Sequence, residues 1–397
     1  MKNLFIKSNT KIKQISTKFT RYLLDEIHPE SRISIIKGAR GVGKTTLLLQ
    51  YARLKIPKNK TILYVSLDDL FFLSNNLYQL AEEFYKDNGS YLLLDEVHKY
   101  PNWSRELKLI YDDFPDLQLL VTSSSLLEIY KSESDLSRRA ITYPLKELSL
   151  REFLYFEKNI SFPVYSLDDI IHHHIDISYE ITAKIKPIHE FKKYLQYGMY
   201  PYFLEGKKLF QEKLIQTINL TLETDLPAVE RVDFEHVVKI KKLLFAIASS
   251  APFTPNITKL SERTGISRSG LLKALHYLEK ARLINFVNKN NKGISILSKP
   301  DKIFINNPNL QLALANGEHN IGAVRESFFV NQLKGLHKIN LATKGDFIVD
   351  DTLTFEIGGK NKTKHQIKDL KNAYIVRDDF ENGFKNYIPL WLFGFLY

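Results

Sequence analysis

The residues Gly-Ala-Arg-Gly-Val-Gly-Lys-Thr-Thr at positions 38–46 have the spacing G-x-x-x-x-G-K-[ST]. Glycines at this spacing let the backbone curl so that successive N–H groups face a phosphate, and a helix beginning here adds positive potential. The lysine of such a loop neutralises phosphate oxygens, and the hydroxyl after it binds Mg²⁺. The spacing predicts a site for ATP and Mg²⁺, against the alternative of a chance glycine-rich turn. The expected nucleotide-binding residues are Gly38, Ala39, Arg40, Gly41, Val42, Gly43, Lys44, Thr45 and Thr46, with Thr45 as a magnesium ligand.

A second motif, Tyr-Leu-Leu-Leu-Asp-Glu at positions 91–96, ends an apolar run with two carboxylates. The run predicts a buried strand that delivers Asp95 to the carboxyl edge of a sheet, where open α/β sheets bind their ligands. We expect Asp95 to hold Mg²⁺ through a water molecule, and Glu96 to polarise the attacking water as general base. A helix start that carries the common pair Asp-Glu is the alternative. The phosphate-binding spacing earlier in the chain favours the catalytic interpretation.

Other polar residues of this region are candidates for contacting the terminal phosphate. Ser123 or Ser124, after an apolar run, would report that phosphate as a sensor or else cap a helix. His98 lies within reach of the same phosphate or is a surface or capping histidine. Arg138 and Arg139 include a candidate arginine finger toward a neighbouring subunit, which would require a homo-oligomer, or they form structural pairs.

Alternating strand and helix patterns must position these residues. Near-continuously apolar runs predict strands at 33–37, 61–67, 91–95, 117–122 and 140–145. Amphipathic segments predict helices around 44–53, 77–87, 103–113 and 125–131. This alternation is typical of an α/β core, a parallel sheet covered on both faces. The strand at 61–67, between the two motifs, indicates the additional-strand class of P-loop ATPases that use a catalytic glutamate.

The remaining chain reads as helical and then mixed. Residues 147–240 are mostly helical, with breaks at Pro163, Pro187, Pro201 and Pro227. Helices are predicted at 239–251, 257–265 and 267–283, the last capped by Ser267, followed by a hairpin at 284–298. Beyond residue 320 an α/β unit is predicted, with a helix at 323–334 and strands near 338–342, 346–349, 353–357, 373–376 and 388–396.

Several segments together resemble an uncharacterised family of prokaryotic AAA-type ATPases. They are the P-loop, LLLDEVHKYPNW (92–103), VTSSS (121–125), SRRAITYPLKELSLREF (137–153), YLQYGMYPYF (194–203) and KPDKIFINNPNL (299–310). Many relatives have a glycine where Ser123 stands, and Arg139 best matches the finger arginine. The resemblance implies an ATPase domain at 1–150, a helical region at 151–238, a winged-helix domain at 239–310 and a restriction-nuclease-like domain at 311–397.

The expected winged-helix domain carries basic residues on its recognition helix. They are Arg268, Ser269, Lys273, His276 and Lys280, with Lys289 and Lys292 in the wing. Basic side chains on one helix face suit phosphate contact and groove entry, which favours nucleic acid as a partner. The formal net charge of +11 agrees with this, although lysine-rich codon usage also explains it. A packing or regulatory role, with a protein partner, is the alternative.

The nuclease resemblance implies two acids and a lysine on adjacent strands, where a divalent metal and the lysine would stabilise a phosphorane. Glu326, Asp346 and Glu356 are the candidate acids. The lysine position is Gly358, and the nearest lysines are Lys360, Lys362 and Lys364. Either a lysine has migrated or cleavage is lost, and we expect loss or severe impairment. The run His172–His174 is assigned no role.

Composition limits the remaining choices. At 397 residues the chain is too long for one core, and its lack of cysteine excludes disulfides and cysteine-based zinc sites. The N-terminus lacks a secretory apolar region, and the apolar run 388–397 is too short to span a membrane, so a cytoplasmic protein is expected. The sequence predicts Mg²⁺-dependent ATP hydrolysis that moves the appended modules. Its rivals are an ATP-gated switch with negligible turnover and an ATP-regulated DNA nuclease.

Overall fold

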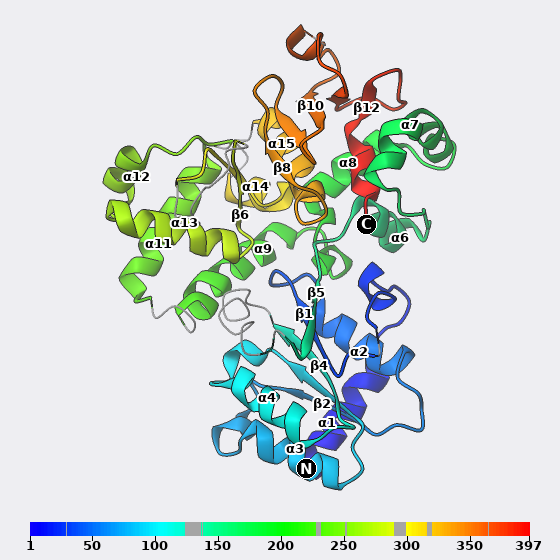
Figure 1. Cartoon of the computed structure of the whole chain (residues 1–397), viewed down its shortest axis with the longest axis vertical. Coiled ribbons are helices and arrows are strands. Elements are labelled where there is room, and N and C mark those ends of the chain that lie inside the picture. The colour runs from blue at the N-terminus through cyan, green and yellow to red at the C-terminus, as the bar shows by residue number, and fades with distance from the viewer. Residues whose placement is uncertain are drawn as a thin grey trace. The chain divides into compact units, whose positions relative to one another are not determined.

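The computed structural model describes residues 1–28, 30–123, 136, 138–227, 232–250, 252–289, 299–315, 320–363 and 365–397 (Figure 1). The chain forms two compact units. The first comprises Met1–Glu147 and the segment Glu223–Val232, and the second comprises Leu148–Leu222 and Asp233–Tyr397. The first unit therefore includes a short segment whose flanking stretches both belong to the second.

The first unit contains a five-stranded parallel sheet in the order β2-β3-β4-β1-β5. Its strands are β1 (Ile33–Lys37), β2 (Ile62–Ser66), β3 (Tyr91–Asp95), β4 (Gln118–Ser123) and β5 (Ala140–Pro144). The predicted α/β core is thus confirmed, with strand bounds close to those expected. In the sheet β4 lies between the two motif-bearing strands β1 and β3, whereas β2, which lies between the two motifs along the chain, is an edge strand. Crossover connections let a strand return beside any neighbour, so order along the chain does not determine order in the sheet.

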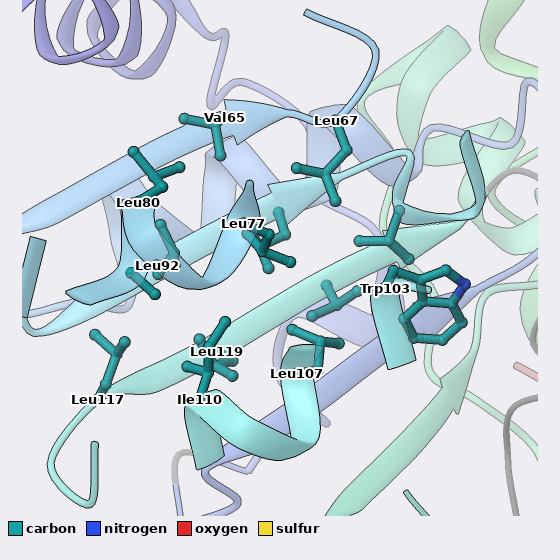
Figure 2. Packing of buried hydrophobic residues seen from close by; sticks show 14 of the residues in the cluster. Val65, Leu67, Leu77, Leu80, Leu92, Trp103, Leu107, Ile110, Leu117 and Leu119 are labelled. Atoms are coloured by element: carbon teal, nitrogen blue, oxygen red, sulfur yellow. The ribbon is translucent and has the colours of Figure 1, made fainter. Parts of the chain in front are cut away.

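Helices α1 (Lys2–Gln14), α2 (Lys44–Leu54), α3 (Leu77–Lys86) and α4 (Trp103–Asp113) flank this sheet. Figure 2 shows apolar side chains of α3 and α4, among them Leu80 and Leu107, packed against Leu92 and Leu119 of the strands. Each such buried side chain contributes about 1.5–3 kcal/mol. The sheet is therefore a stiff platform for the loops at its carboxyl edge. The helix predicted around 125–131 lies outside the described residues.

The second unit begins with helices. They are α6 (Leu150–Lys158), α7 (Leu167–Thr182), α8 (Pro187–Lys193), the π-helical η4 (Tyr194–Gly198), the 3-10 helix η5 (Pro201–Leu204) and α9 (Phe210–Leu220). Pro187 and Pro201 occupy the first positions of α8 and η5, where a missing N–H costs nothing. Both expected breaks are thus helix starts. Another π-helical turn, η6 (Thr221–Asp225), leads into the segment that packs with the first unit.

Three helices and a two-stranded sheet follow, namely α11 (Phe234–Ala248), α12 (Ile257–Thr264), α13 (Arg268–Lys280), β6 (Ile284–Val287) and β7 (Lys302–Ile305). The Ser267 side chain caps α13 by accepting a hydrogen bond from the Gly270 N–H, as predicted. β6 pairs antiparallel with β7, downstream of the hairpin expected at 284–298. Most of the expected second strand lies outside the described residues.

The C-terminal part holds α14 (Pro308–Leu314), α15 (Ile321–Leu333) and a mixed sheet in the order β12-β11-β10-β9-β8. Its strands are β8 (Ile339–Leu341), β9 (Phe347–Val349), β10 (Leu353–Gly358), β11 (Ala373–Arg377) and β12 (Tyr387–Pro389). The strand expected at 388–396 is wrong beyond Pro389, because Leu390–Phe395 form a buried 3-10 helix. A continuous apolar run without alternation fits a buried helix as well as a strand. Among the described residues, no helix is long and apolar enough to cross a membrane.

Candidate functional site

The loop between β1 and α2 has the backbone that its glycines predict. Gly41 and Gly43 adopt φ angles of 84° and 97°, a region that side-chain-bearing residues rarely enter. A Cβ at Gly38 would lie 2.4 Å from the carbonyl oxygen of Leu145, so only glycine fits there. The loop therefore leads directly into the N-terminus of α2, with its unpaired N–H groups available for an anion.

Lys44, the first residue of α2, is buried within this loop. Its ammonium donates hydrogen bonds to the carbonyl oxygens of Gly38 at 3.1 Å and Ala39 at 2.7 Å. Burial lowers the pKa of Lys44 to about 8, although the carboxylates of Glu96 and Asp95 act against this shift. A buried ammonium that water solvates poorly and that donates to neutral carbonyl oxygens is stabilised when it binds a phosphate.

Asp95 ends β3 and is surrounded by hydroxyl donors. Its Oδ2 accepts hydrogen bonds from Thr45 Oγ1 and Tyr64 OH, each at 2.9 Å, and its Oδ1 accepts one from Thr122 Oγ1. Burial and the Asp95 charge raise the pKa of Tyr64, so this phenol stays a neutral donor. All three donors are uncharged hydroxyl groups, so these contacts orient the carboxylate without placing an opposite charge on it. Paired with the Thr45 hydroxyl, it offers the oxygen ligands that Mg²⁺ prefers.

Tyr64 and Thr122 were missed by sequence reasoning. They come from β2 and β4, the two strands that flank β3 in the sheet. Thr122 carries a usable signal, since it is a polar residue near the end of an apolar strand. Tyr64 carries none, because tyrosine is common in strands and only the sheet order brings it beside Asp95.

Glu96 follows Asp95 in a left-handed conformation, with φ of 57°. Its N–H donates to Thr122 Oγ1 at 3.2 Å. Glu96 Oε2 lies 3.4 Å from Lys99 Nζ and 3.7 Å from His98 Nε2. Burial acts to lower the pKa of Lys99, but the hydrogen bond to Asp68 and the charge of Glu96 raise it. Lys99 is therefore a permanent cation beside Glu96 that sequence reasoning did not single out.

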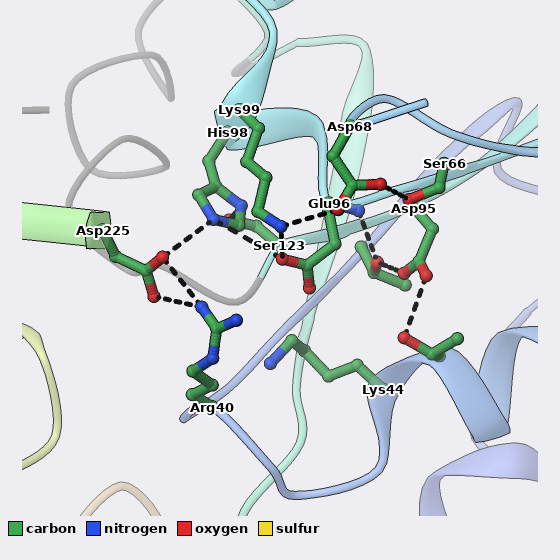
Figure 3. A network of polar contacts seen from close by, with 12 residues as sticks. Arg40, Lys44, Ser66, Asp68, Asp95, Glu96, His98, Lys99, Ser123 and Asp225 are labelled. Carbon is green, nitrogen blue, oxygen red and sulfur yellow. Dashed lines mark hydrogen bonds and ion pairs between the residues drawn. The ribbon is translucent and has the colours of Figure 1, made fainter. Parts of the chain in front are cut away.

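A third acid, Asp225, comes from the segment Glu223–Val232 (Figure 3). Its two carboxylate oxygens accept hydrogen bonds from Arg40 Nη1 at 2.9 and 3.0 Å. His98 is buried, with its Nε2 3.7 Å from Asp225 Oδ1 and its Nδ1 3.2 Å from Ser123 Oγ. Burial acts to raise the pKa of Asp225, but the neighbouring His98 and Arg40 hold it below its usual value. No sequence pattern linked this distant aspartate to the P-loop.

The remaining predicted residues of the ATP site lie elsewhere. Ser124 is outside the described residues, whereas Ser123 is buried beside His98. Arg139 pairs in two places with Asp112 of its own chain, through Nε at 3.0 Å and Nη2 at 3.1 Å. Arg138 is exposed. The structural pairing considered for Arg139 is thus present, and its role as a finger stays a prediction.

On α13 the expected basic face is partly displayed. Arg268, Ser269 and Lys273 are exposed, whereas His276 and Lys280 are half-buried. Lys273 also lies over the ring of Tyr277, with Nζ 5.5 Å from the ring centroid. In the expected wing, Lys289 is exposed and Lys292 lies outside the described residues. The exposed basic residues of α13 thus lie in the N-terminal half of the helix.

The C-terminal sheet brings the candidate acids to a lysine. Glu356 is fully buried on β10, and its Oε1 lies 2.5 Å from Lys362 Nζ. A Cβ at Gly358 would lie within 2.6 Å of the Lys362 side chain, so the glycine leaves the space through which this lysine reaches Glu356. Lys362, one of the lysines near Gly358 along the chain, is thus the one that lies beside Glu356.

The other two acids of this cluster have partners of their own. Glu326 pairs with Lys302 at 2.7 Å, and burial raises the pKa of Glu326 against the effect of that lysine. Asp346 Oδ2 accepts a hydrogen bond from the Ile357 N–H at 2.7 Å. Within the described part of the chain, no group of three or more acidic or histidine side chains has an arrangement that would hold a metal ion. His174 is buried, and its ring contacts backbone carbonyls, which is a structural role.

Comparison with known proteins agrees with the first unit. Residues 30–154 match the family model of an AAA domain, and residues 188–320 match that of a domain of unknown function, DUF8612. The chain is similar to the uncharacterized protein MJ1637 of Methanocaldococcus jannaschii, with 30% identity over 284 residues. That match covers 68% of this chain and 59% of the relative, so this chain spans well under two thirds of its length.

Two solved structures show a weaker similarity. The Walker-type ATPase PABY2304 of Pyrococcus abyssi has a TM-score of 0.40 at 12% identity, covering 73% of this chain and 93% of that one. AMPPCP-bound DnaA from Aquifex aeolicus has a TM-score of 0.27 at 16% identity, covering 67% of this chain and 93% of that one. These values are too low to carry a functional argument. Residues 30–154, which match the model of an AAA domain, contain the P-loop and the five-stranded parallel sheet.

Proposed function

We propose that the chain binds ATP with Mg²⁺ and hydrolyses it, and that hydrolysis changes the conformation of the appended unit. The observation that carries this proposal is the meeting of Lys44, Thr45, Asp95 and Glu96 at one edge of the sheet, with Thr45 and Asp95 2.9 Å apart. The three side-chain types needed are present there: a buried cation for phosphate, oxygen ligands for a hard metal, and a carboxylate beyond them.

Each residue has a separate task in this proposal. The loop N–H groups and Lys44 bind the β- and γ-phosphates, and Thr45 and Asp95 hold Mg²⁺, which supplies charge neutralisation when bound. Tyr64 and Thr122 orient the Asp95 carboxylate without neutralising it. Glu96 accepts a proton from the attacking water. Lys99 Nζ, 3.4 Å from Glu96 Oε2, places a positive charge beside this carboxylate.

The test is ATP turnover by purified wild-type protein of known oligomeric state, beside Glu96→Gln and Lys44→Ala. Glu96→Gln should bind ATP normally and lose turnover by about 100-fold or more, since only the base is removed. Lys44→Ala should lose binding itself. Wild-type turnover in Glu96→Gln would remove Glu96 from the mechanism. Tight binding without turnover in the wild type would instead establish the rival function, an ATP-gated switch.

The partner on which this cycle acts is proposed to be nucleic acid, bound through the N-terminal half of α13. Exposed Arg268 and Lys273 and the net charge of +11 support this. Replacing Arg268 and Lys273 together should weaken duplex or single-strand binding. Each lost phosphate contact should also lower the slope of log affinity against log salt by roughly 0.7–0.9. Failure of the wild type to bind at low salt, with and without ATP, would favour a protein partner.

A further inference from the structure

One contact of the P-loop has no part in the mechanism above. Arg40 Nη1 donates hydrogen bonds to both carboxylate oxygens of Asp225, at 2.9 and 3.0 Å, and the Asp225 side chain is 1% exposed. A guanidinium held by a buried carboxylate makes the same kind of contact as a guanidinium held by a phosphate. Asp225 therefore binds Arg40 through the same kind of charged hydrogen bond that a nucleotide phosphate would form.

The Arg40–Asp225 pair lies close to the expected place of the phosphates. Figure 3 shows the Arg40 guanidinium and the Lys44 ammonium directed toward the same space, with Asp225 beside Arg40. Among the charges that act on the pKa of Lys44 are both Asp225 and Arg40. Asp225 is also 3.7 Å from His98, which lies equally near Glu96. A terminal phosphate entering here would meet the cation that Asp225 holds and would be repelled by Asp225 itself.

The position of Asp225 in the chain gives the contact a consequence beyond the site. Asp225 belongs to Glu223–Val232, the short segment that packs with the first unit. The chain immediately before this segment, through Leu222, and immediately after it, from Asp233, belongs to the second unit. Asp225 is therefore joined along the chain to α9 on one side and to α11 on the other.

We propose that Asp225 is an internal competitor of the γ-phosphate of ATP for Arg40. It rests on the proposed function, since it requires that the P-loop binds ATP. When a triphosphate binds, Arg40 passes from Asp225 to the γ-phosphate, and the segment Glu223–Val232 is released. A diphosphate lacks the competing group and leaves the pair in place. The segment therefore distinguishes ATP from ADP, because a ligand shifts an equilibrium only through its different affinity for the two states.

The first test compares the affinities of a fluorescent ATP and a fluorescent ADP for the full chain. Asp225→Asn keeps the shape of the side chain and removes its charge, so it should bind ATP about tenfold more tightly, or about 1.4 kcal/mol, with ADP changed by less than about twofold. Glu223→Gln is the matched control, because it removes one negative charge from an exposed position of the same segment. It should change neither affinity. Equal changes for ATP and ADP, or weaker ATP binding, would overturn the proposal.

A second variant tests whether Arg40 carries the effect. In an Arg40→Gln background, adding Asp225→Asn should leave the ratio of ATP to ADP affinity unchanged, because the contested cation is gone. A persistent Asp225→Asn effect in that background would show that general repulsion, not competition for Arg40, is responsible, and would overturn the proposal.

The third measurement needs no variant and covers the case in which Asp225→Asn does not fold. Hydrogen exchange of backbone amides in residues 222–227 of the wild type should become faster with a non-hydrolysable ATP analogue and stay unchanged with ADP. Unchanged or slower exchange with the bound analogue would reject the release of the segment while leaving ATP binding intact. A wild type that binds neither nucleotide would instead reject the proposed function and this inference with it.

Discussion

Asp95 in the first unit and Glu356 in the second are both buried carboxylates on strands, yet their charges are satisfied in opposite ways. Asp95 accepts hydrogen bonds from three hydroxyl groups, those of Thr45, Tyr64 and Thr122. Glu356 is paired with the ammonium of Lys362. Hydroxyl donors orient a carboxylate and leave its charge, whereas an ammonium cancels it. The first site is therefore built to attract a cation, and the second is neutralised from within.

The two lysines of these regions differ in the same sense. Burial lowers the pKa of Lys44 to about 8. Burial acts in the same direction on Lys362, but the adjacent Glu356, with Asp346 and Glu326 beyond it, raises the Lys362 pKa above its usual value. Lys44 thus donates to two neutral carbonyl oxygens in a buried place where a phosphate would stabilise its charge, while Lys362 is paired with a carboxylate of its own chain. Neighbouring acids and lysines therefore indicate a function only when it is known which of them are paired with each other.

The largest expected effect comes from removing the charge of Asp95. Asp95→Asn keeps the shape of the side chain but removes its negative charge and one oxygen, which lowers the affinity for Mg²⁺. ATP turnover should therefore fall by about 100-fold or more, or about 2.7 kcal/mol. Steady-state ATPase rates across a magnesium titration measure this. Glu356→Gln is the matched carboxylate in the other region and should leave the rate unchanged. Comparable losses in both variants would end the distinction between the two sites.

A smaller effect is expected on folding stability at the second site. Lys362→Met leaves Glu356 buried without its cation, which should cost about 1–3 kcal/mol, less than a fully buried pair because Lys362 is partly exposed. Denaturant unfolding of the full chain measures the change. Lys360→Met, on an exposed lysine of the same turn, is the control and should be neutral. Adding Glu356→Gln to Lys362→Met should recover stability. If it does not, the Glu356–Lys362 ion pair does not account for the loss of stability.

The pH dependence of ATP binding should report the lowered pKa of Lys44. Bound phosphate raises the pKa of Lys44 above its value of about 8 in this structure, so binding takes up a proton in the range between the two values. ATP affinity is therefore full below about pH 8 and should fall by up to about tenfold per unit above it. Fluorescence titrations at pH 7, 8 and 9 measure the fall. A flat profile would contradict the lowered pKa, whereas Lys44→Arg should be flat wherever it still binds.

The smallest effect is expected in a cleavage assay, where we predict little or no metal-dependent cutting of plasmid DNA. The sequence indicates this loss because Gly358 stands at the expected lysine position, and the structure adds a reason from the pairing of the acids. Lys362 does reach Glu356, but Glu356 and Glu326 are each neutralised by a lysine, which leaves little charge for a metal. Incubation with Mg²⁺ or Mn²⁺, with and without ATP, tests this. Cleavage that disappears in Glu356→Ala would establish the nuclease that we expect to be inactive.

Much of the first unit was predictable because its signals are local. An apolar run, a glycine spacing and an acidic pair each lie within a few residues of one another, and the five predicted strands match the sheet. The second unit was less predictable. The run 388–396 has no alternation to distinguish strand from helix, so only β12 forms a strand there. β6 pairs with β7, and most of the second strand of the hairpin expected at 284–298 lies outside the described residues.

By itself the sequence determined the P-loop, the acidic pair after β3 and the α/β class, because each depends on residue types at short and regular spacing. Only the tertiary structure decided that β4 separates β1 from β3, that Tyr64 and Thr122 surround Asp95, and that Asp225 holds Arg40. It also decided that Lys362, and not a lysine at 358, reaches Glu356. These contacts join residues far apart in the chain. Sheet order and chain crossings set them, and no local pattern records either one.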